Sequence, residues 1–301
     1  MTASRDKLYA AVEALIAEET GERSRIASSG SVGGGCINAA QVVTLEDGRR
    51  YFLKSNADPL PELFAREADG LRALAAPGAI RVPRVIGHGG GEGGAPPFLL
   101  TEAILSGPQP KGFMHEFGAQ LARLHQATRQ DRCGFDHDNY IGSTPQPNGW
   151  MDDWVAFWAE RRLGFQLDLT EKNHRSSPEM RRLGQSLLHR LPDLIGEPVE
   201  PACLLHGDLW GGNYLCSDRG EPVLIDPAAY YGRREADLAM TLLFGGFTNA
   251  FYGGYESVWP LAPGSKTRLE IYKLYHLLNH LNIFGGGYMG GCLEILRRYG
   301  G

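Results

Sequence analysis

The spacing of apolar residues changes near residue 102, and this change limits the chain to a fold with two unlike parts. Upstream, short β-prone runs alternate with helical patterns, whereas downstream the spacing is helical apart from one β-hairpin between 213 and 226. The expected upstream strands cover 38–45, 49–54, 81–86 and 97–101, and the expected upstream helices cover 5–20 and 61–76. The expected downstream helices cover 113–128, 151–167, 178–195 and 268–284. The sequence therefore predicts an α+β chain with a small β-rich lobe at 1–102 and a larger, mainly helical lobe at 103–301.

Composition and charge argue against several classes of protein. The 301 residues are enough for two lobes with separate cores, and 43% hydrophobic against 22% charged residues is typical of a soluble globular protein. The formal charge of −5 argues against a nucleic-acid partner, and no apolar run approaches the roughly 20 residues of a membrane helix. Because the first residues lack the apolar stretch of a secretion signal and the five cysteines are scattered, we expect a cytoplasmic protein with reduced thiols. The sequence leaves the oligomeric state open.

The most informative motif is Leu-Leu-His-Gly-Asp-Leu-Trp-Gly-Gly-Asn-Tyr at 204–214. Asp208 and Asn213 are separated by four residues, which is the spacing of a kinase catalytic loop. In that loop the carboxylate accepts the proton of the attacking hydroxyl, and the amide oxygen holds a magnesium ion on the phosphates. We therefore predict Asp208 as the catalytic base, in contact with the substrate, and Asn213 as a Mg²⁺ ligand.

A second carboxylate follows at the end of an apolar strand. Asp226 comes 18 residues after Asp208, and the hairpin between them folds the chain back toward Asn213. Phosphoryl transfer needs a metal ion that bridges phosphate oxygens, and carboxylates are its usual protein ligands. Asp226 is therefore predicted as the second Mg²⁺ ligand.

The upstream lobe contributes a candidate ion pair. Lys54 lies at the end of the third expected strand, where a kinase lysine contacts the α- and β-phosphates of ATP. Glu67 shares the apolar face of the following helix, where an unpaired carboxylate would be costly. We expect Glu67 to pair with Lys54.

Two backbone segments are candidates for the rest of the ATP site. A glycine triplet about 20 residues before Lys54 would let backbone amides approach the phosphates closely, and the neighbouring thiol of Cys36 is a candidate redox switch. The segment after the last upstream strand is expected to bind adenine through its backbone. The predicted nucleotide-binding residues are Gly33, Gly34, Gly35, Cys36, Lys54, Glu67, Glu102, Ala103 and Ile104.

Two local features favour a small-molecule acceptor over a protein. Gly207 stands where protein kinases place an arginine that often pairs with a phosphorylated activation loop. Only ten residues separate Asp226 from Asp237, which leaves no room for a long activation segment. Asp237 is expected to bind the backbone of the catalytic loop.

Several further blocks of sequence resemble the fructosamine kinase family, also called ketosamine 3-kinases. They lie at 134–136, 146–154, 206–213, 225–232, 234–239, 244–247 and 275–284. The resemblance implies the two-lobed protein-kinase-like fold, with ATP and Mg²⁺ as cofactors. It also implies phosphorylation of the 3-hydroxyl of a ketosamine, a fructose- or ribulose-derived sugar-amine, followed by release of the amine in deglycation repair. The acceptor would be a small sugar-amine or a glycated protein amine. The alternatives are a related kinase for an aminoglycoside or a choline-like alcohol, and a catalytically inactive nucleotide-binding scaffold.

Aromatic residues are the candidates for binding the sugar. Trp210, inside the catalytic loop, is predicted to contact the substrate, whereas Trp154 also fits a buried helical face. The carboxylates of Asp152 or Asp153 are candidates to meet the ammonium. Packing and hydrogen bonding within their own lobe are the expected roles of His276 and His280, and Arg161 and Arg162 are expected on a solvated or ion-paired helix face.

Overall fold

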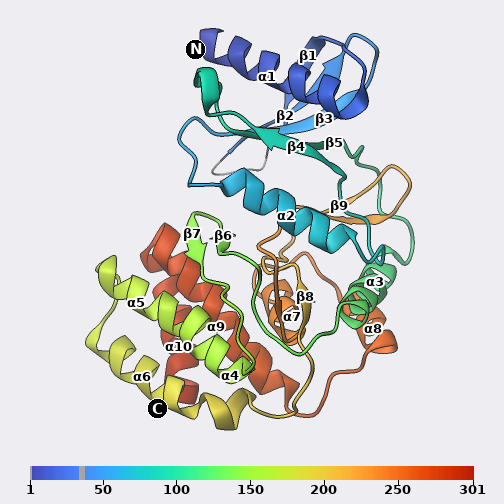
Figure 1. Cartoon of the computed structure of the whole chain (residues 1–301). Coiled ribbons are helices and arrows are strands. Elements are labelled where there is room, and N and C mark those ends of the chain that lie inside the picture. Colours follow the sequence, from blue (N-terminus) through green and yellow to red (C-terminus); the bar gives the residue numbers. More distant parts are fainter. Residues whose placement is uncertain (1, 34–37) are drawn as a thin grey trace.

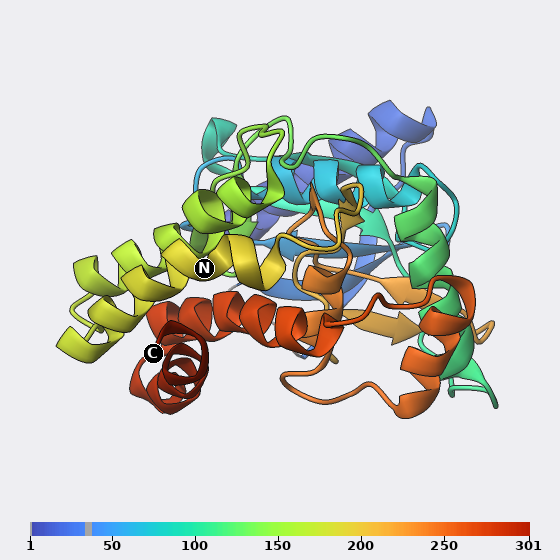
Figure 2. The same cartoon turned by 90° about the horizontal axis from the view of Figure 1, so that it is seen from below.

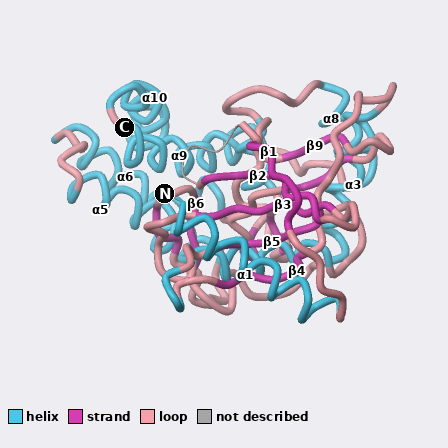
Figure 3. The backbone as a smooth tube through the Cα atoms, turned by 90° about the horizontal axis from the view of Figure 1, so that it is seen from above, coloured by secondary structure: helices cyan, strands magenta, loops and turns pink. Residues whose placement is uncertain are grey.

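The computed structural model describes residues 2–33 and 38–301, and it contains a five-stranded antiparallel sheet followed by a mainly helical part. The strands lie in the order β1 (Ile26–Ser31), β2 (Ala39–Leu45), β3 (Arg50–Ser55), β5 (Phe98–Glu102) and β4 (Val85–Gly89), as Figure 3 shows. Gly34, Gly35 and Cys36 lie outside the described residues.

Two helices flank this sheet on opposite faces. Helix α1 (Thr2–Thr20) covers the outer face, and α2 (Leu63–Ala75) lies between the sheet and the helical lobe (Figure 1). The alternation of strand side chains explains the arrangement, because Leu53 packs in the core under α1 whereas Lys54 points to the α2 side. A short turn, η1 (Glu92–Gly94), separates β4 from β5.

The helical lobe holds the rest of the chain. Its helices are α3 (Phe113–Ala127), α4 (Trp154–Phe157), the π-helix η2 (Trp158–Gly164), α5 (Phe165–Lys172), α6 (Pro178–Ile195), α7 (Glu235–Thr241), α8 (Asn249–Val258), α9 (Ser265–Phe284), η3 (Gly286–Tyr288) and α10 (Met289–Gly300). Figure 2 shows α5, α6, α9 and α10 at one end of the lobe and the pair α3 and α8 at the other. One continuous core joins these helices to the apolar face of α2.

Three short antiparallel strand pairs position the loops of the helical lobe. They are β6 (Asn139–Ile141) with β7 (Thr144–Gln146), β8 (Cys203–Leu205) with β11 (Tyr230–Gly232), and β9 (Tyr214–Cys216) with β10 (Pro222–Leu224). The segment 206–213 therefore leaves β8 and enters β9, and the segment after β10 returns beside it to reach β11. These pairings place the catalytic-loop motif at 206–213 next to Asp226.

The fold class is confirmed, but several elements differ from the prediction. Strand β1 was not predicted, because its exposed, polar residues carry no apolar signal and its order comes from pairing with β2. The strand expected at 81–86 is wrong in its bounds: β4 begins at Val85, and Arg81 forms an isolated parallel bridge with Val223. Helix α8 was also missed. It packs so closely on α3 that a Cβ at Gly118 would lie 1.9 Å from the carbonyl oxygen of Phe251.

Among the described residues, none of the helices combines the length and the apolar character needed to cross a membrane. The four described cysteines, Cys133, Cys203, Cys216 and Cys292, are free and buried.

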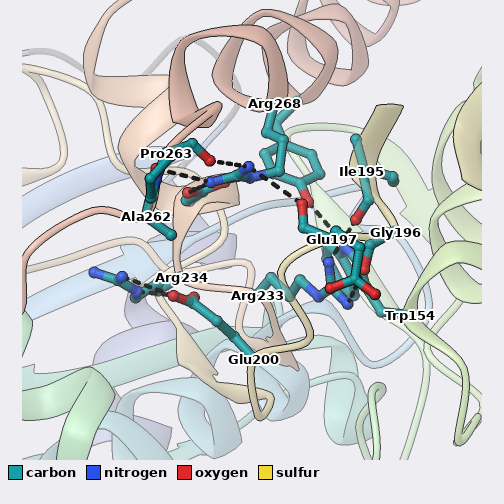
Figure 4. A network of polar contacts seen from close by, with 12 residues as sticks. Trp154, Ile195, Gly196, Glu197, Glu200, Arg233, Arg234, Ala262, Pro263 and Arg268 are labelled. Atoms are coloured by element: carbon teal, nitrogen blue, oxygen red, sulfur yellow. Dashed lines mark hydrogen bonds and ion pairs between the residues drawn. The ribbon is translucent and has the colours of Figure 1, made fainter. Parts of the chain in front are cut away.

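Buried arginines tie loops of the helical lobe to α7, as Figure 4 shows. The guanidinium of Arg268 binds both carboxylate oxygens of Glu235 at 2.7 Å and also donates to the carbonyl of Pro263 at 2.9 Å. Next to it, Arg234 donates to both carboxylate oxygens of Glu200 at 2.8 and 2.9 Å. The loops that precede β8 and α9 are thus fixed through charged hydrogen bonds, not through apolar packing alone.

We expect Arg268→Met to lower the free energy of unfolding by about 3 kcal/mol, because the change leaves the Glu235 carboxylate buried without a partner. Urea unfolding followed by circular dichroism measures the loss. Arg298→Met is the matched control, since the Arg298 side chain is 51% exposed in its pair with Glu270 and should contribute far less to the free energy of unfolding. Equal losses in the two variants would contradict the expectation.

Candidate active site

Lys54 lies between two carboxylates where the two lobes meet. Its Nζ is 2.7 Å from Oε1 of Glu67 on α2 and 2.5 Å from Oδ1 of Asp226, which follows β10. The expected Lys54–Glu67 pair is therefore present. Burial opposes the charge of this lysine, but the two carboxylates together raise its pKa and keep it charged. The bond to Asp226 joins residues that are 172 positions apart.

Asp226 occupies an unusual backbone conformation. Its φ of 55° lies in the left-handed region, which a residue other than glycine rarely adopts. The backbone is held there by its neighbours: Ile225 N donates to the carbonyl of Asn213 at 3.1 Å, and the His206 ring bonds the carbonyl of Ile225 at 2.8 Å. Such conformations cluster at functional sites, where surrounding contacts offset their cost.

The loop after β8 brings Asp208 and Asn213 together. The side-chain amide of Asn213 donates to the backbone oxygen of Asp208 at 2.8 Å and to its carboxylate Oδ2 at 3.2 Å. Gly207 makes the turn possible, because its φ is 82° and a Cβ there would lie 2.0 Å from the carbonyl oxygen of Ala228. An arginine could not occupy this position without moving the segment that precedes β11.

Asp237 of α7 holds the start of this loop, as the sequence predicted. Its two carboxylate oxygens accept hydrogen bonds from the backbone N–H groups of His206, at 2.7 Å, and Gly207, at 2.8 Å. The sequence reasoning missed His125 on α3, whose ring lies 3.2 Å from the same carboxylate and 2.8 Å from the hydroxyl of Tyr255. Although Asp237 is buried, its hydrogen bond to His125 helps to lower its pKa, so it stays ionised in the core.

The surroundings of Asp208 raise the pKa of its carboxyl group. Burial raises the pKa of this half-buried carboxyl to about 7, and the Asp226 carboxylate adds to the shift. A general base works best with a pKa near the operating pH. A carboxylate that titrates near neutrality can take a proton from a hydroxyl and release it again.

This pKa leads to an expected pH dependence. The carboxylate accepts a proton only when it is ionised. At limiting substrate, kcat/KM should therefore fall about tenfold for each pH unit below pH ~7, and it should be constant above that pH. Initial rates between pH 5 and pH 9 measure the profile, and the residual activity of Asp208→Asn should lack this acid limb. A plateau that extends down to pH 5 would contradict the raised pKa.

The side-chain oxygen atoms around Asp208 are suitable ligands for a magnesium ion. The amide nitrogen of Asn213 is engaged with Asp208, which leaves its Oδ1 for a cation, and the Asp226 side chain is 42% exposed. Mg²⁺ is commonly bound by one or two protein groups together with substrate phosphates. In the part of the chain that the structure describes, no group of three or more His, Cys, Asp or Glu is arranged to hold a metal by itself, so phosphate oxygens would complete the coordination.

A cavity of about 630 Å³ contains these side chains. On the sheet side it is lined by Val32, Gly33, Ala40, Leu99, Thr101, Glu102 and Ile104. Glu102 and Ile104 thus border the cavity, whereas Ala103 does not line it. The Glu102 carboxylate is turned to Arg81, at 2.7 Å, and its backbone N–H donates to the carbonyl of Arg84 at 2.8 Å, so its own carbonyl is the part left for a ligand. The predicted nucleotide-binding residues Gly34, Gly35 and Cys36 lie outside the described residues.

The far end of the cavity is formed by the helical lobe. Trp210 lines it and is 38% exposed, whereas Trp154 is buried and its indole donates to the hydroxyl of Tyr272 at 2.9 Å. The carboxylates considered for the ammonium lie elsewhere, because Asp152 pairs with Arg132 and Asp153 caps α4. Residues that the sequence reasoning did not assign to the site also line this end: Asn139, Tyr140, Asn279, His280 and Phe284. His280 bonds the carbonyl of His276, as expected, but it also faces the cavity.

A β-rich lobe and a helical lobe around one charged cavity define the class of small-molecule phosphotransferases with a kinase-like fold. The fold is shared with an aminoglycoside phosphotransferase, APH(4)-Ia, crystallised in complex with ADP and hygromycin B (TM-score 0.65, 16% identity, 97% of this chain and 99% of that one). At that identity the likeness concerns the fold alone.

The chain belongs to the fructosamine kinase family, whose model matches residues 8–299. It is 44% identical to a probable ketoamine kinase of Synechocystis sp., over 94% of each chain, and 41% identical to the chloroplastic protein-ribulosamine 3-kinase of Arabidopsis thaliana, over 93% of this chain and 84% of that one. A crystal structure from Haemophilus somnus, assigned as a fructosamine-3-kinase, superposes with a TM-score of 0.88 at 27% identity and 99% coverage of both chains. The family resemblance seen in the sequence is thereby confirmed, and ATP follows as the phosphate donor of a kinase in this family.

Proposed function

We propose that this protein is an ATP- and Mg²⁺-dependent ketosamine 3-kinase, which transfers the γ-phosphate of ATP to the 3-hydroxyl of a sugar-amine. The observation that carries the proposal is the meeting of Lys54 with Asp226, 2.5 Å apart, in the same cavity as Asp208 and Asn213. We place the boundary between the two lobes after Glu102, so the cavity lies between them.

Each of these residues has a definite task. Lys54, held by Glu67, is placed to bind the α- and β-phosphates of ATP. Asp208 is the base that accepts the proton of the attacking hydroxyl, and its pKa of about 7 suits this exchange. Trp210 offers an exposed ring face on which the sugar can pack.

Asp226 and Asn213 would hold the Mg²⁺ ion. When bound, the ion neutralises charge that develops on the phosphate oxygens. The chain contributes the orientation of the two ligands: Asn213 is fixed by Asp208, and Asp226 is fixed by Lys54 and by its backbone conformation.

The chemistry of the product supports a role in deglycation. Once the carbonyl at C2 of the ketosamine enolises toward C1, the phosphate on C3 can leave as inorganic phosphate, and water then hydrolyses the resulting imine and releases the amine. The substrate would be a fructose or ribulose derivative, either on a small amine or on a protein amine. Four free, buried cysteines suit a reducing compartment, and we propose the cytoplasm.

The alternatives lack comparable support. An aminoglycoside or choline-like acceptor is favoured by the fold alone. An inactive scaffold would be expected to lack part of the lysine, base and metal-ligand set, yet Lys54, Asp208, Asn213 and Asp226 line one cavity here.

A substrate screen tests the proposal. Purified protein is mixed with Mg·ATP and, in parallel, with a fructosylamine, a ribulosylamine, choline and an aminoglycoside, and ADP release is measured. Phosphorus NMR then identifies the phosphorylated hydroxyl. Turnover with a ketosamine and phosphate on its O3 is the expected result. Turnover restricted to choline or the aminoglycoside would refute the proposed substrate, and no turnover with any acceptor would favour the scaffold.

A further inference from the structure

Arg162 is a fully buried cation whose partners carry no charge. In the described part of the chain its guanidinium donates to neutral oxygens: the carbonyls of Pro147, at 2.6 Å, and Arg161, at 3.0 Å, and Oδ1 of Asn148, at 2.7 Å. The ring face of Tyr230, 3.9 Å from the guanidinium carbon, offsets part of the cost of burial. Because a buried charge without a counter-charge is costly, and because a π-helix such as η2 often marks a functional site, the arginine points to a specific role.

A chain of buried amides leads from Arg162 to the backbone that follows Asp226. The side-chain Nδ2 of Asn148 donates to Oδ1 of Asn139 at 2.9 Å, and Nδ2 of Asn139 donates to the carbonyl of Ala229 at 2.8 Å. The side chains in this chain are no more than 4% exposed. Each amide accepts from the group before it and donates to the group after it, so the hydrogen bonds run in one direction and strengthen one another.

Gln146 adds a second branch to this chain. Its Nε2 donates to Oδ1 of Asn139 at 2.8 Å and to the carbonyl of Ala228 at 3.0 Å, and its Oε1 accepts from the hydroxyl of Tyr275 at 2.7 Å. We call the side chains of Asn139, Gln146 and Asn148 the amide network. Three of the sequence blocks that resemble the family meet here: 146–154, 225–232 and 275–284.

The arginine sets the direction of these hydrogen bonds. A guanidinium only donates and a main-chain carbonyl only accepts, so each amide between Arg162 and the carbonyl of Ala229 has one favourable orientation. A reversed Asn148 would place its NH2 group against the guanidinium, and a reversed Asn139 would place its oxygen against the carbonyl of Ala229. A neutral, apolar side chain at position 162 would remove the group that fixes this order.

The amide network supports the backbone that carries a predicted metal ligand. Ala228 follows Asp226 by two residues; its N–H donates to the carbonyl of His206 at 2.9 Å, and its own carbonyl accepts from Gln146. The φ of 55° at Asp226 is a conformation that surrounding contacts must maintain. Asp226 and Ala228 line the cavity, whereas Gln146 and Arg162 do not, so the support comes from behind the cavity wall.

We propose that Arg162 is a positioning residue for phosphoryl transfer: through the amide network it holds the segment 226–229 so that Asp226 is correctly placed for the metal ion of Mg·ATP. The inference rests on the proposed function and adds to it a residue that touches neither nucleotide nor acceptor. Without the donor at position 162, Asn148 loses its fixed orientation and the hydrogen bonds to Ala228 and Ala229 weaken. Asp226 then becomes less ordered, and the affinity for the metal ion falls.

Metal affinity, measured without any acceptor, tests this role. Binding of Mn²⁺ in the presence of a non-hydrolysable ATP analogue is followed by electron paramagnetic resonance. Arg162→Met keeps most of the side-chain volume but no donor, and it should raise the dissociation constant for Mn²⁺ about tenfold, as loss of an outer partner of a metal ligand does. Arg162→Lys restores a donor toward Asn148 and should stay within about threefold of wild type.

Turnover gives a second readout. With a ketosamine as acceptor, Arg162→Met should raise the Mg²⁺ concentration for half-maximal rate about tenfold, whereas kcat at saturating Mg²⁺ should stay within about threefold of wild type. Loss of stability alone would not produce this division between the metal requirement and kcat.

Asn148→Asp separates positioning from stability. The substitution preserves the shape of the side chain and gives Arg162 a carboxylate partner, so the variant should remain folded, but it removes the donor to Asn139. It should therefore weaken Mn²⁺ binding as Arg162→Met does, and it tests the proposal even if Arg162→Met does not fold. A purely stabilising role for Arg162 predicts unchanged Mn²⁺ affinity in Asn148→Asp.

Arg233→Met is the matched control. Arg233 is also buried, at 7% exposed, and its guanidinium donates to the main-chain carbonyls of Ile195 and Gly196, which lie outside the cavity lining (Figure 4). The variant should be less stable toward urea and keep the Mn²⁺ affinity of wild type. Unchanged Mn²⁺ affinity in Asn148→Asp or in folded Arg162→Met, or an equal shift in Arg233→Met, would overturn the positioning role and leave the kinase proposal intact. If wild-type protein binds no Mn²⁺ with the nucleotide analogue, the proposed function fails, and this inference fails with it.

Discussion

Asp208→Asn is expected to lower kcat about a thousand-fold, because the amide cannot accept the proton of the attacking hydroxyl. The contacts that would hold ATP belong to other residues, chiefly Lys54 and Asp226, so the dissociation constant for ATP should change by no more than about threefold. Single-turnover kinetics with a ketosamine and titration with a non-hydrolysable ATP analogue measure the two quantities.

The same variant carries an internal control for folding. In the folded protein the pKa of Asp208 is raised to about 7, so ionising this carboxyl costs stability, and that cost grows as the pH rises toward the folded pKa. Asp208→Asn should therefore unfold at a higher temperature than wild type at pH 8, and the gain should be smaller at pH 4. Retained turnover in a folded variant would refute the assignment of the base, and a variant less stable than wild type at pH 8 would refute the buried carboxylate.

Asp226→Asn is expected to lower kcat/KM about a hundred-fold or more and to raise the Mg²⁺ concentration for half-maximal rate at least about tenfold. The variant keeps an oxygen atom at this position but loses the negative charge that binds Lys54 and that we propose to hold the metal ion. Initial rates at saturating ATP and increasing Mg²⁺ give both values.

Glu67→Gln is the matched control for this second variant. Glu67 also binds Lys54, at 2.7 Å, but from α2 and without belonging to the predicted metal ligands. The control should raise the KM for ATP and leave the Mg²⁺ requirement close to that of wild type. If both variants shift the Mg²⁺ requirement equally, the loss in Asp226→Asn reflects the position of the lysine and not a metal ligand.

Arg162 shows why helical spacing alone misplaced some residues. The sequence reading put it on a solvated or ion-paired face, and this is wrong: the residue is fully buried. Its guanidinium donates to the carbonyl of Pro147 at 2.6 Å and to Oδ1 of Asn148 at 2.7 Å, and it lies 3.9 Å from the ring centroid of Tyr230. The helix is a π-helix from Trp158 to Gly164, whose wider turn rotates side chains away from the positions that a period of 3.6 predicts.

The aromatic rings around His280 were missed for a different reason. Phe244, Phe284 and Tyr288 belong to segments that are unremarkable one at a time, and His280 looked like a packing residue on its own helix. His280, Phe284 and Tyr288 follow one another at four-residue spacing, but only the contact between the loop after α7 and the end of α9 brings the ring of Phe244 to 4.6 Å from His280 and 6.5 Å from Tyr288. A local pattern carries no information about such a contact.

By itself the sequence determined which functional groups the chain carries and their order: an upstream lysine, then the predicted base, the amide and the second carboxylate. The last three are separated by spacings that suit a hairpin. Those features depend on hydrogen bonds and periodicity within a few residues, so they can be read from the chain. The tertiary structure alone decided that Lys54 reaches Asp226 across 172 positions, and that the cavity ends in aromatic rings instead of the carboxylates of Asp152 or Asp153. Both results come from the packing of α2 and α9 against loops that are remote in the sequence, where burial and shape complementarity of whole elements set the geometry.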